Sequence, residues 1–275
     1  MAFSQHRIKF SRQIVAGLLN LGTVALIARV YGPEGNGAFA VALFLPSLLA
    51  SLLNLGVAPA NVYHLGAKHF HPEDILHANL RIFMVFSLLG MTLGASAISW
   101  KSETWFPGVD ASLLWFALAI FPISLLNGYL HSLFQGLQQF RPYNFLAIAQ
   151  PAALLVFVAL LTLIGNQNLA LLIVAQLVAA VLVFMLTVIW LRPIVKADGD
   201  SASTNVPVKQ TLGYGWKAHL SNMLAFINYK ADVFLANFFL GPAAVGVYVI
   251  AVALAEKLWL MSQAVSTGLL PRLAQ

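Results

Sequence analysis

The sequence has 275 residues, of which 60% are hydrophobic and 9% are charged. Soluble globular domains carry about 25% charged residues, so this composition excludes a soluble protein. The absence of cysteine from the sequence excludes disulfides and cysteine-ligated metals. The net charge of +6 comes from residues in the loops between apolar segments, which favours membrane topology over nucleic-acid binding as its explanation.

The apolar residues come in blocks near the ~20 that a helix needs to cross a bilayer. They predict an all-α polytopic membrane protein with about eight transmembrane helices, at residues 13–31, 37–64, 79–100, 111–136, 143–165, 169–191, 214–239 and 244–269. Residues 1–28 also have the charge and apolar run of a signal peptide. We interpret them as an uncleaved first span, because an internal helix repeats the same pattern.

One long polar stretch, Lys196–Gln210, separates the sixth and seventh predicted helices and has the composition of a flexible linker. It divides the chain into a six-helix N-terminal lobe at 1–195, a linker at 196–212, and the first two helices of an incomplete second lobe at 213–275. Lysine and arginine collect in alternate loops, and only Arg29 and Lys101 fall on the opposite side. By the positive-inside rule, the N-terminus and the linker are cytoplasmic.

Both predicted lobes begin with the same hairpin pattern. Shifting the sequence by 209 positions lays Ile14–Ala60, with its turn Gly32-Pro33, over Met223–Leu269, with its turn Gly241-Pro242. A repeat at this distance is far longer than the ~20–50-residue period of a solenoid. It is typical of transporters that are built from two related halves.

Polar residues at helical spacing form stripes within three predicted helices. Two interpretations stay open: packing between helices, or the wall of a water-filled cavity. The residues that we single out as candidate substrate contacts on these stripes are Asn54, Asn127, His131 and Asn228.

Charged residues inside apolar helices are costly and mark functional sites by default. Lys230 and Glu256 are each thirteen residues from Ala243 at the turn, and so lie at similar depth on adjacent helices. They either form an ion pair that locks the hairpin or serve transport. In the second case Arg12, Lys217, Lys230 and Lys257 would attract an anionic substrate, and Asp232 or Glu256 would take up a coupling cation.

Two other chemistries find little support. The histidines at 64, 69, 71 and 77 do not have the spacing of a known metal site. The loops on the Arg29 side are short and offer only Glu34, Glu103 and Asp110, with no nucleophile–base pair. We therefore predict no enzyme activity, no metal and no cofactor.

The segments 26–39 (LIARVYGPEGNGAF) and 234–248 (FLANFFLGPAAVGVY), with Asn54-Leu-Gly56 and Pro271-Arg-Leu273, resemble the openings of the two lobes of Wzx-type polysaccharide flippases. These proteins belong to the multidrug/oligosaccharidyl-lipid/polysaccharide exporter superfamily. The resemblance implies a two-lobe transporter of the bacterial inner membrane. It would flip undecaprenyl-pyrophosphate-linked O-antigen or exopolysaccharide units by alternating access.

The resemblance also implies partners: the lipid-linked oligosaccharide, membrane lipid, and the polysaccharide polymerase and glycosyltransferases of the same pathway. Family members usually carry twelve to fourteen helices, so we expect the chain to be truncated after its eighth helix or completed by another chain. Two alternatives to the flippase remain. One is a cation-coupled multidrug exporter of the same superfamily, and the other is a membrane scaffold whose polar stripes only pack helices together.

Overall fold

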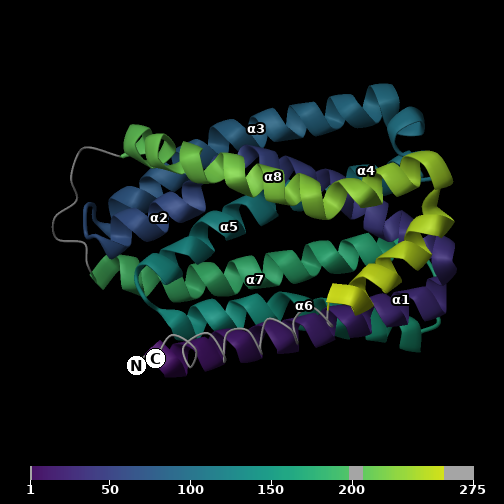
Figure 1. Cartoon of the computed structure of the whole chain (residues 1–275), viewed down its shortest axis with the longest axis horizontal. Coiled ribbons are helices and arrows are strands. Elements are labelled where there is room, and N and C mark those ends of the chain that lie inside the picture. The colour runs from purple at the N-terminus through teal and green to yellow at the C-terminus, as the bar shows by residue number, and fades with distance from the viewer. Residues whose placement is uncertain (1, 198–206, 257–275) are drawn as a thin grey trace, which may run out of the picture.

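The computed structural model describes residues 2–197 and 207–256 of the chain. This part is helical, and its long helices run side by side along one axis (Figure 1). The elements are α1 (Ala2–Leu53), α2 (Val57–Gly66), α3 (Pro72–Trp105), α4 (Ala111–Leu118), α5 (Ile120–Gly136), α6 (Phe140–Leu163), α7 (Leu169–Ala197) and α8 (Val208–Leu240), followed by a helix at Pro242–Glu256.

Six of the described helices are long and apolar enough to cross a membrane, and α4 and α5 together form one of them. Large apolar side chains are exposed on their outer surface, such as Trp100 (83% exposed) and Leu163 (82% exposed). Exposed apolar surface of this extent is expected where lipid replaces water. The prediction of an all-α polytopic membrane protein is therefore confirmed.

The first predicted span and the greater part of the second form the single long element α1, which bends at Gly32. Gly32 has φ 71° and ψ −179°, and Gly241, its counterpart 209 positions later, has φ 80° and ψ 176°. This backbone region is essentially restricted to glycine. We call Gly32-Pro33 and Gly241-Pro242 the corners. They join the arms of the first hairpin (α1) and of the second hairpin (α8 and Pro242–Glu256).

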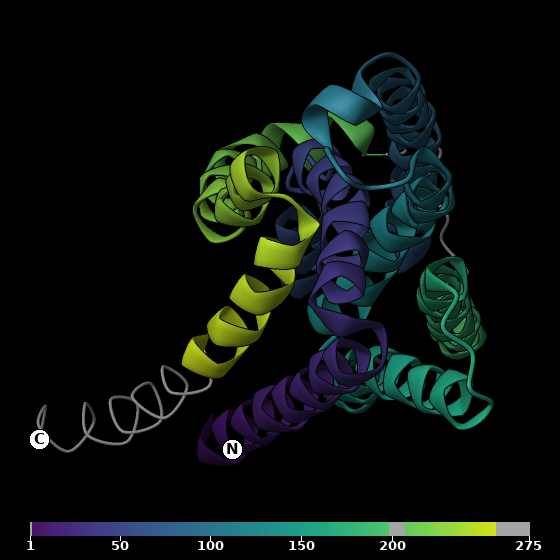
Figure 2. The ribbon, with the colours of Figure 1, turned by 90° about the vertical axis from the view of Figure 1, so that its right-hand side faces the viewer.

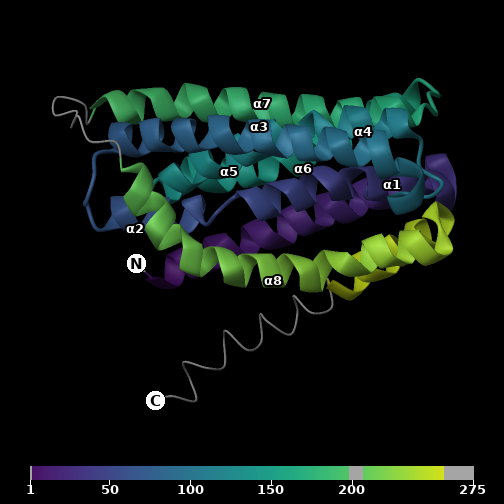
Figure 3. The same cartoon turned by 90° about the horizontal axis from the view of Figure 1, so that it is seen from above.

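The corners lie at one end of the bundle, which we call the corner end. The N-terminus and the turns after α2 and α5 lie at the other end, the N-terminal end (Figures 1 and 3). Figure 2 looks onto the corner end and shows the first arm of α1 and the helix Pro242–Glu256 angling away from the second arm of α1.

The second predicted span, 37–64, is not one continuous helix. It breaks at Asn54–Gly56 and continues as α2, with positive φ at Leu55 (51°) and Gly56 (69°). A Cβ atom on Gly56 would overlap the carbonyl oxygen of Gly215 in α8. The break is therefore tied to a close backbone contact between the two hairpins, which hydropathy cannot reveal.

The interior of the bundle is packed around aromatic side chains. Tyr129, Phe121 and Phe134 are fully buried, and Gly90 of α3 lies so close to Phe121 that a side chain on this glycine would overlap the ring. Small residues at such contacts let membrane helices approach closely. Gly90 also lies against Leu53, and the Tyr129 hydroxyl donates to the Leu53 carbonyl oxygen, so this packing holds the end of the second arm of α1 in place.

Candidate functional site

A cavity of about 530 Å³ lies between the two hairpins, in the middle of the bundle. The first arm of α1, its second arm, α8 and the helix Pro242–Glu256 form most of its wall. Its lining residues are Asn20, Leu21, Thr23, Val24, Ile27, Asn36, Phe39, Ala40, Leu43, Phe44, Ser47, Leu154, Gln176, Lys230, Val233, Val249, Val252, Ala253 and Glu256.

The sequence repeat runs through this wall. Six of the lining residues of the first hairpin have a repeat counterpart, 209 positions later, that also lines the cavity: Leu21 and Lys230, Val24 and Val233, Ala40 and Val249, Leu43 and Val252, Phe44 and Ala253, Ser47 and Glu256. Equivalent faces of the two hairpins are therefore turned toward each other across the cavity. This is the geometry of an interface between structural repeats, where transporters bind substrate.

At the corner end the two hairpins meet through reciprocal glycine contacts. A Cβ atom on Gly37 would overlap the carbonyl oxygen of Pro242, and one on Gly246 would overlap the carbonyl oxygen of Pro33. Asn36, which is buried, donates its side-chain N–H to the carbonyl oxygen of Gly246 at 2.9 Å. The corners thus close the bundle by backbone-to-backbone packing that any side chain would disrupt.

At the N-terminal end, α8 contacts α2. The ring of Tyr63 in α2 stacks on that of Tyr214 in α8, with centroids 4.1 Å apart and planes 8° apart. His64 packs edge-on against the same Tyr214 ring. Together with the contact between Gly56 and Gly215, this stack fixes the position of α8 against α2.

The charges of the cavity come from the second hairpin. Lys230 and Glu256 both line it, whereas their repeat counterparts Leu21 and Ser47 are uncharged. Two charged side chains in an otherwise apolar and weakly polar wall are the natural contacts for a charged part of a ligand. Lys257 lies outside the described residues.

Asp232 does not line this cavity. One of its carboxylate oxygens accepts a hydrogen bond from the hydroxyl group of Tyr248, and the other accepts one from the backbone N–H of Val233. Tyr248 belongs to the other arm of the second hairpin, so Asp232 ties the two arms together.

The remaining predicted cations and amides also lie elsewhere. The Arg12 guanidinium lies 4.8 Å from the ring centre of Tyr143. Lys217 and Asn228 are exposed on α8, and Asn54 is half-buried at the break between α1 and α2. None of these four residues is among those that line the cavity.

Asn127 of the predicted stripes and the neighbouring amide Asn61 connect helices of the bundle. Asn127 donates a hydrogen bond to the carbonyl oxygen of Ala180 in α7 at 3.2 Å, and Asn61 donates one to the hydroxyl oxygen of Ser132 at 2.8 Å. His131, half-buried, packs against the ring of Tyr143. These contacts are those of packing between helices, the first of the two interpretations of the stripes.

Five polar lining residues were not among the predicted contacts: Asn20, Thr23, Asn36, Ser47 and Gln176. Ser47 shares a helix face with the predicted contact Asn54, seven residues later, so helical spacing points to it. Asn36 falls in the turn and could be recognised only through its partner Gly246, which is 210 positions away in sequence.

Single-cysteine variants can distinguish positions that face the water-filled cavity from positions that are buried between helices, because the sequence contains no cysteine of its own. We expect Ser47→Cys and Asn20→Cys to react with a water-soluble maleimide, because both positions line the cavity and are exposed. Asn127→Cys and Asn61→Cys should be inert, because both positions are buried. Equal labelling at all four positions, or no labelling at Ser47, would contradict this assignment.

No metal centre is evident in the described ranges, where no three histidine or carboxylate side chains come together. The features that define the site are the duplicated hairpin, the cavity on the repeat interface and the glycine-packed corners. Many membrane transporters that are built from related halves share these features.

Comparison with known proteins agrees with this class. The structure is similar to that of a transporter of the MOP superfamily from Pyrococcus furiosus Vc1 (DSM3638), whose description reports a binding pocket of reverse polarity that suggests a different function. The TM-score is 0.60 at 17% sequence identity, and the match covers 90% of this chain and 61% of the other. A multidrug resistance MATE family transporter of the same superfamily, in an inward-facing conformation, gives a TM-score of 0.57 at 18% identity, with 86% and 57% covered.

Residues 8–275 match the family described as polysaccharide biosynthesis protein, and the chain belongs to this family. Its fold is that of membrane transporters rather than enzymes. No protein of curated function matches the sequence. The chain spans about 61% and 57% of the length of the two solved transporters.

Proposed function

We propose that this protein translocates an undecaprenyl-pyrophosphate-linked oligosaccharide, an O-antigen or exopolysaccharide repeat unit, across the bacterial inner membrane by alternating access. The cavity between the hairpins would hold the polar part of the substrate. The observation that carries this proposal is the set of six repeat-equivalent pairs in its wall. Membership of the polysaccharide biosynthesis family supports the substrate class.

In this proposal Lys230 attracts the pyrophosphate as a point charge. Lys257, next to Glu256 in sequence, is a second candidate. Arg12, Lys217, Asn54, Asn127, His131 and Asn228 remain candidates for contacts made in another state of the transport cycle, with less support because they do not line the cavity.

The proposed topology puts the N-terminal end of the bundle in the cytoplasm, following the lysine and arginine bias. Residues 1–195 would form the first lobe, 196–212 the linker, and 213–275 the first two helices of the second lobe. The polymerase and glycosyltransferases of the same pathway would be the partners of the transporter.

One observation favours a second candidate, a cation-coupled multidrug exporter. Glu256 is a carboxylate in the cavity wall, and such a group can take up a proton or a metal cation. Asp232 is the weaker choice for coupling, since it does not line the cavity.

Complementation distinguishes the two functions. In cells whose own flippase is deleted, we expect the complete gene product to restore surface glycan and to leave resistance to cationic dyes unchanged. Resistance to dyes without restored glycan would overturn the flippase proposal and support the exporter.

A further inference from the structure

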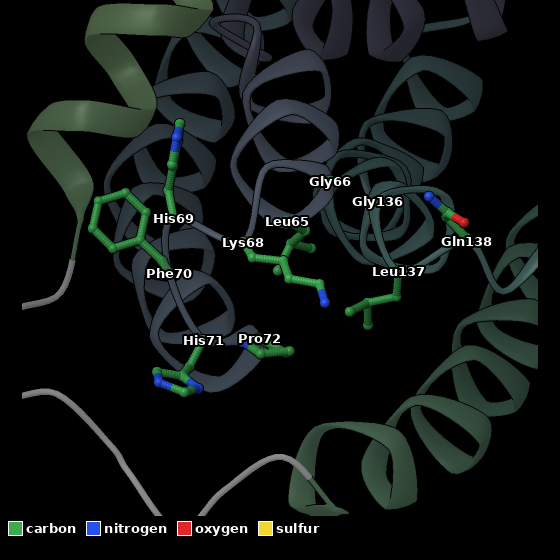
Figure 4. A pocket seen from close by; sticks show the side chains of 10 residues that line it. All are labelled: Leu65, Gly66, Lys68, His69, Phe70, His71, Pro72, Gly136, Leu137 and Gln138. Carbon is green, nitrogen blue, oxygen red and sulfur yellow. The ribbon is translucent and has the colours of Figure 1, made fainter.

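A second cavity, of about 470 Å³, lies at the N-terminal end of the bundle and shares no lining residue with the cavity between the hairpins. It is enclosed by the turn from α2 to α3 and the end of α5 (Figure 4). Its lining residues come from two short segments, 65–72 without Ala67 and 136–138.

The two turns are copies of each other. Gly66-Ala-Lys-His-Phe-His-Pro72 and Gly136-Leu-Gln-Gln-Phe-Arg-Pro142 share Gly, Phe and Pro at the same positions, 70 residues apart. Their backbones agree as well, because Lys68 has φ 55° and Gln138 has φ 56°. In each turn the residue after this position donates its N–H to a carbonyl oxygen five residues back, at 2.9 Å from His69 and 2.8 Å from Gln139.

These turns form a rigid frame. A six-residue hydrogen-bonded turn with a left-handed residue is a well-defined helix C-terminus. A Cβ atom on Gly136 would lie 2.9 Å from the Cβ atom of Leu65, so α5 packs tightly on α2 beneath the cavity. The cavity is thus built by two fixed helix ends rather than by loose loops.

The lining combines cationic and apolar groups. Lys68 extends into the space between the two turns, toward Pro72 and Leu137 (Figure 4). His69 and His71 add two imidazoles, and none of the described residues in the lining is acidic. Glu73 and Asp74 follow directly in α3 but do not line the cavity.

We propose that this cavity binds the phosphate of an anionic phospholipid headgroup from the cytoplasmic leaflet, an assignment that rests on the proposed orientation of the chain. Basic pockets between the cytoplasmic ends of membrane helices are suited to such headgroups. The ammonium group of Lys68 contacts the phosphate, and Leu65, Phe70 and Leu137 cover the adjoining apolar part of the lipid. Inorganic phosphate in solution carries the same chemical group as the lipid headgroup, so the test has to distinguish these two ligands.

The test compares the thermal unfolding of the complete protein in nanodiscs of phosphatidylcholine with and without phosphatidylglycerol. Lys68→Asn removes the charge and keeps a residue that tolerates positive φ, and Lys209→Gln removes an exposed lysine outside the cavity. We expect phosphatidylglycerol to raise the Tm of the wild type and of Lys209→Gln by several degrees, and to leave the Tm of Lys68→Asn unchanged. Lys68→Arg should retain the shift.

Equal Tm shifts in the wild type and in Lys68→Asn would overturn the site. If inorganic phosphate raises the Tm in nanodiscs of phosphatidylcholine alone, and does not raise it for Lys68→Asn, the ligand is inorganic phosphate rather than the lipid. If Lys68→Asn fails to fold, native mass spectrometry can count the phosphatidylglycerol molecules bound to the wild type and to Lys68→Arg. The absence of bound phosphatidylglycerol from both proteins would contradict the proposal. These readouts involve no transport, so they fail or succeed independently of the glycan complementation.

Discussion

Replacing Gly37 or Gly246 by alanine should sharply reduce both transport and stability. Either Cβ atom would overlap a carbonyl oxygen of the opposite corner, and a backbone oxygen cannot move aside as a flexible side chain can. Forcing atoms into a packed contact typically costs about 1–3 kcal/mol. We therefore expect a lower Tm in detergent and loss of glycan export in complemented cells.

Gly213→Ala is the matched control, because a Cβ atom at this helical position would have no neighbouring atom within 4 Å. Alanine there should stabilise α8 by roughly 0.5–1 kcal/mol. Gly37 and Gly246 form one contact, so the double variant should be less destabilised than the sum of the single variants. A Tm for Gly37→Ala equal to that of Gly213→Ala would contradict the packed corner.

Reversing the charge of Lys230 is the second change with a large expected effect. Lys230→Glu places a second carboxylate beside the cavity that Glu256 already lines, and repels a pyrophosphate. We expect glycan export to fall by at least about tenfold, equivalent to ~1.4 kcal/mol of lost interaction. Lys230→Arg should retain most of the export.

Lys209→Glu makes the same charge change on an exposed position of α8 outside the cavity, and should export normally. In the multidrug alternative the pattern is different: Glu256→Gln abolishes dye resistance, while Lys230→Glu has little effect. Normal glycan export by Lys230→Glu would remove this lysine from the substrate site.

Much of the fold can be predicted from the sequence because its signals are local. Runs of apolar residues locate the spans, and the recurring Gly-Pro pairs locate both corners. The break at Leu55–Gly56 escapes such reasoning, because it accompanies a contact with Gly215 that is distant in sequence. The boundary between α2 and α3 shows the same limit, since α3 begins at Pro72 rather than at residue 79.

The candidate site is predictable in part. Counting residues from the corner placed Lys230 and Glu256 at one depth, and both line the cavity. Helical spacing alone could not tell which polar stripe faces the cavity. Asn127 and Asn61 satisfy the same periodicity as Ser47, yet their side chains bond to neighbouring helices of the lobe. Only the three-dimensional packing separates these cases.

The most direct test of the central claim is translocation in proteoliposomes that contain the complete protein and an undecaprenyl-pyrophosphate-linked oligosaccharide. A glycan-cleaving enzyme added outside measures how quickly the sugar of the inner leaflet becomes accessible. The claim predicts rapid exposure with the wild type and slow exposure with Lys230→Glu. Exposure by the wild type that is no faster than in protein-free vesicles would contradict it.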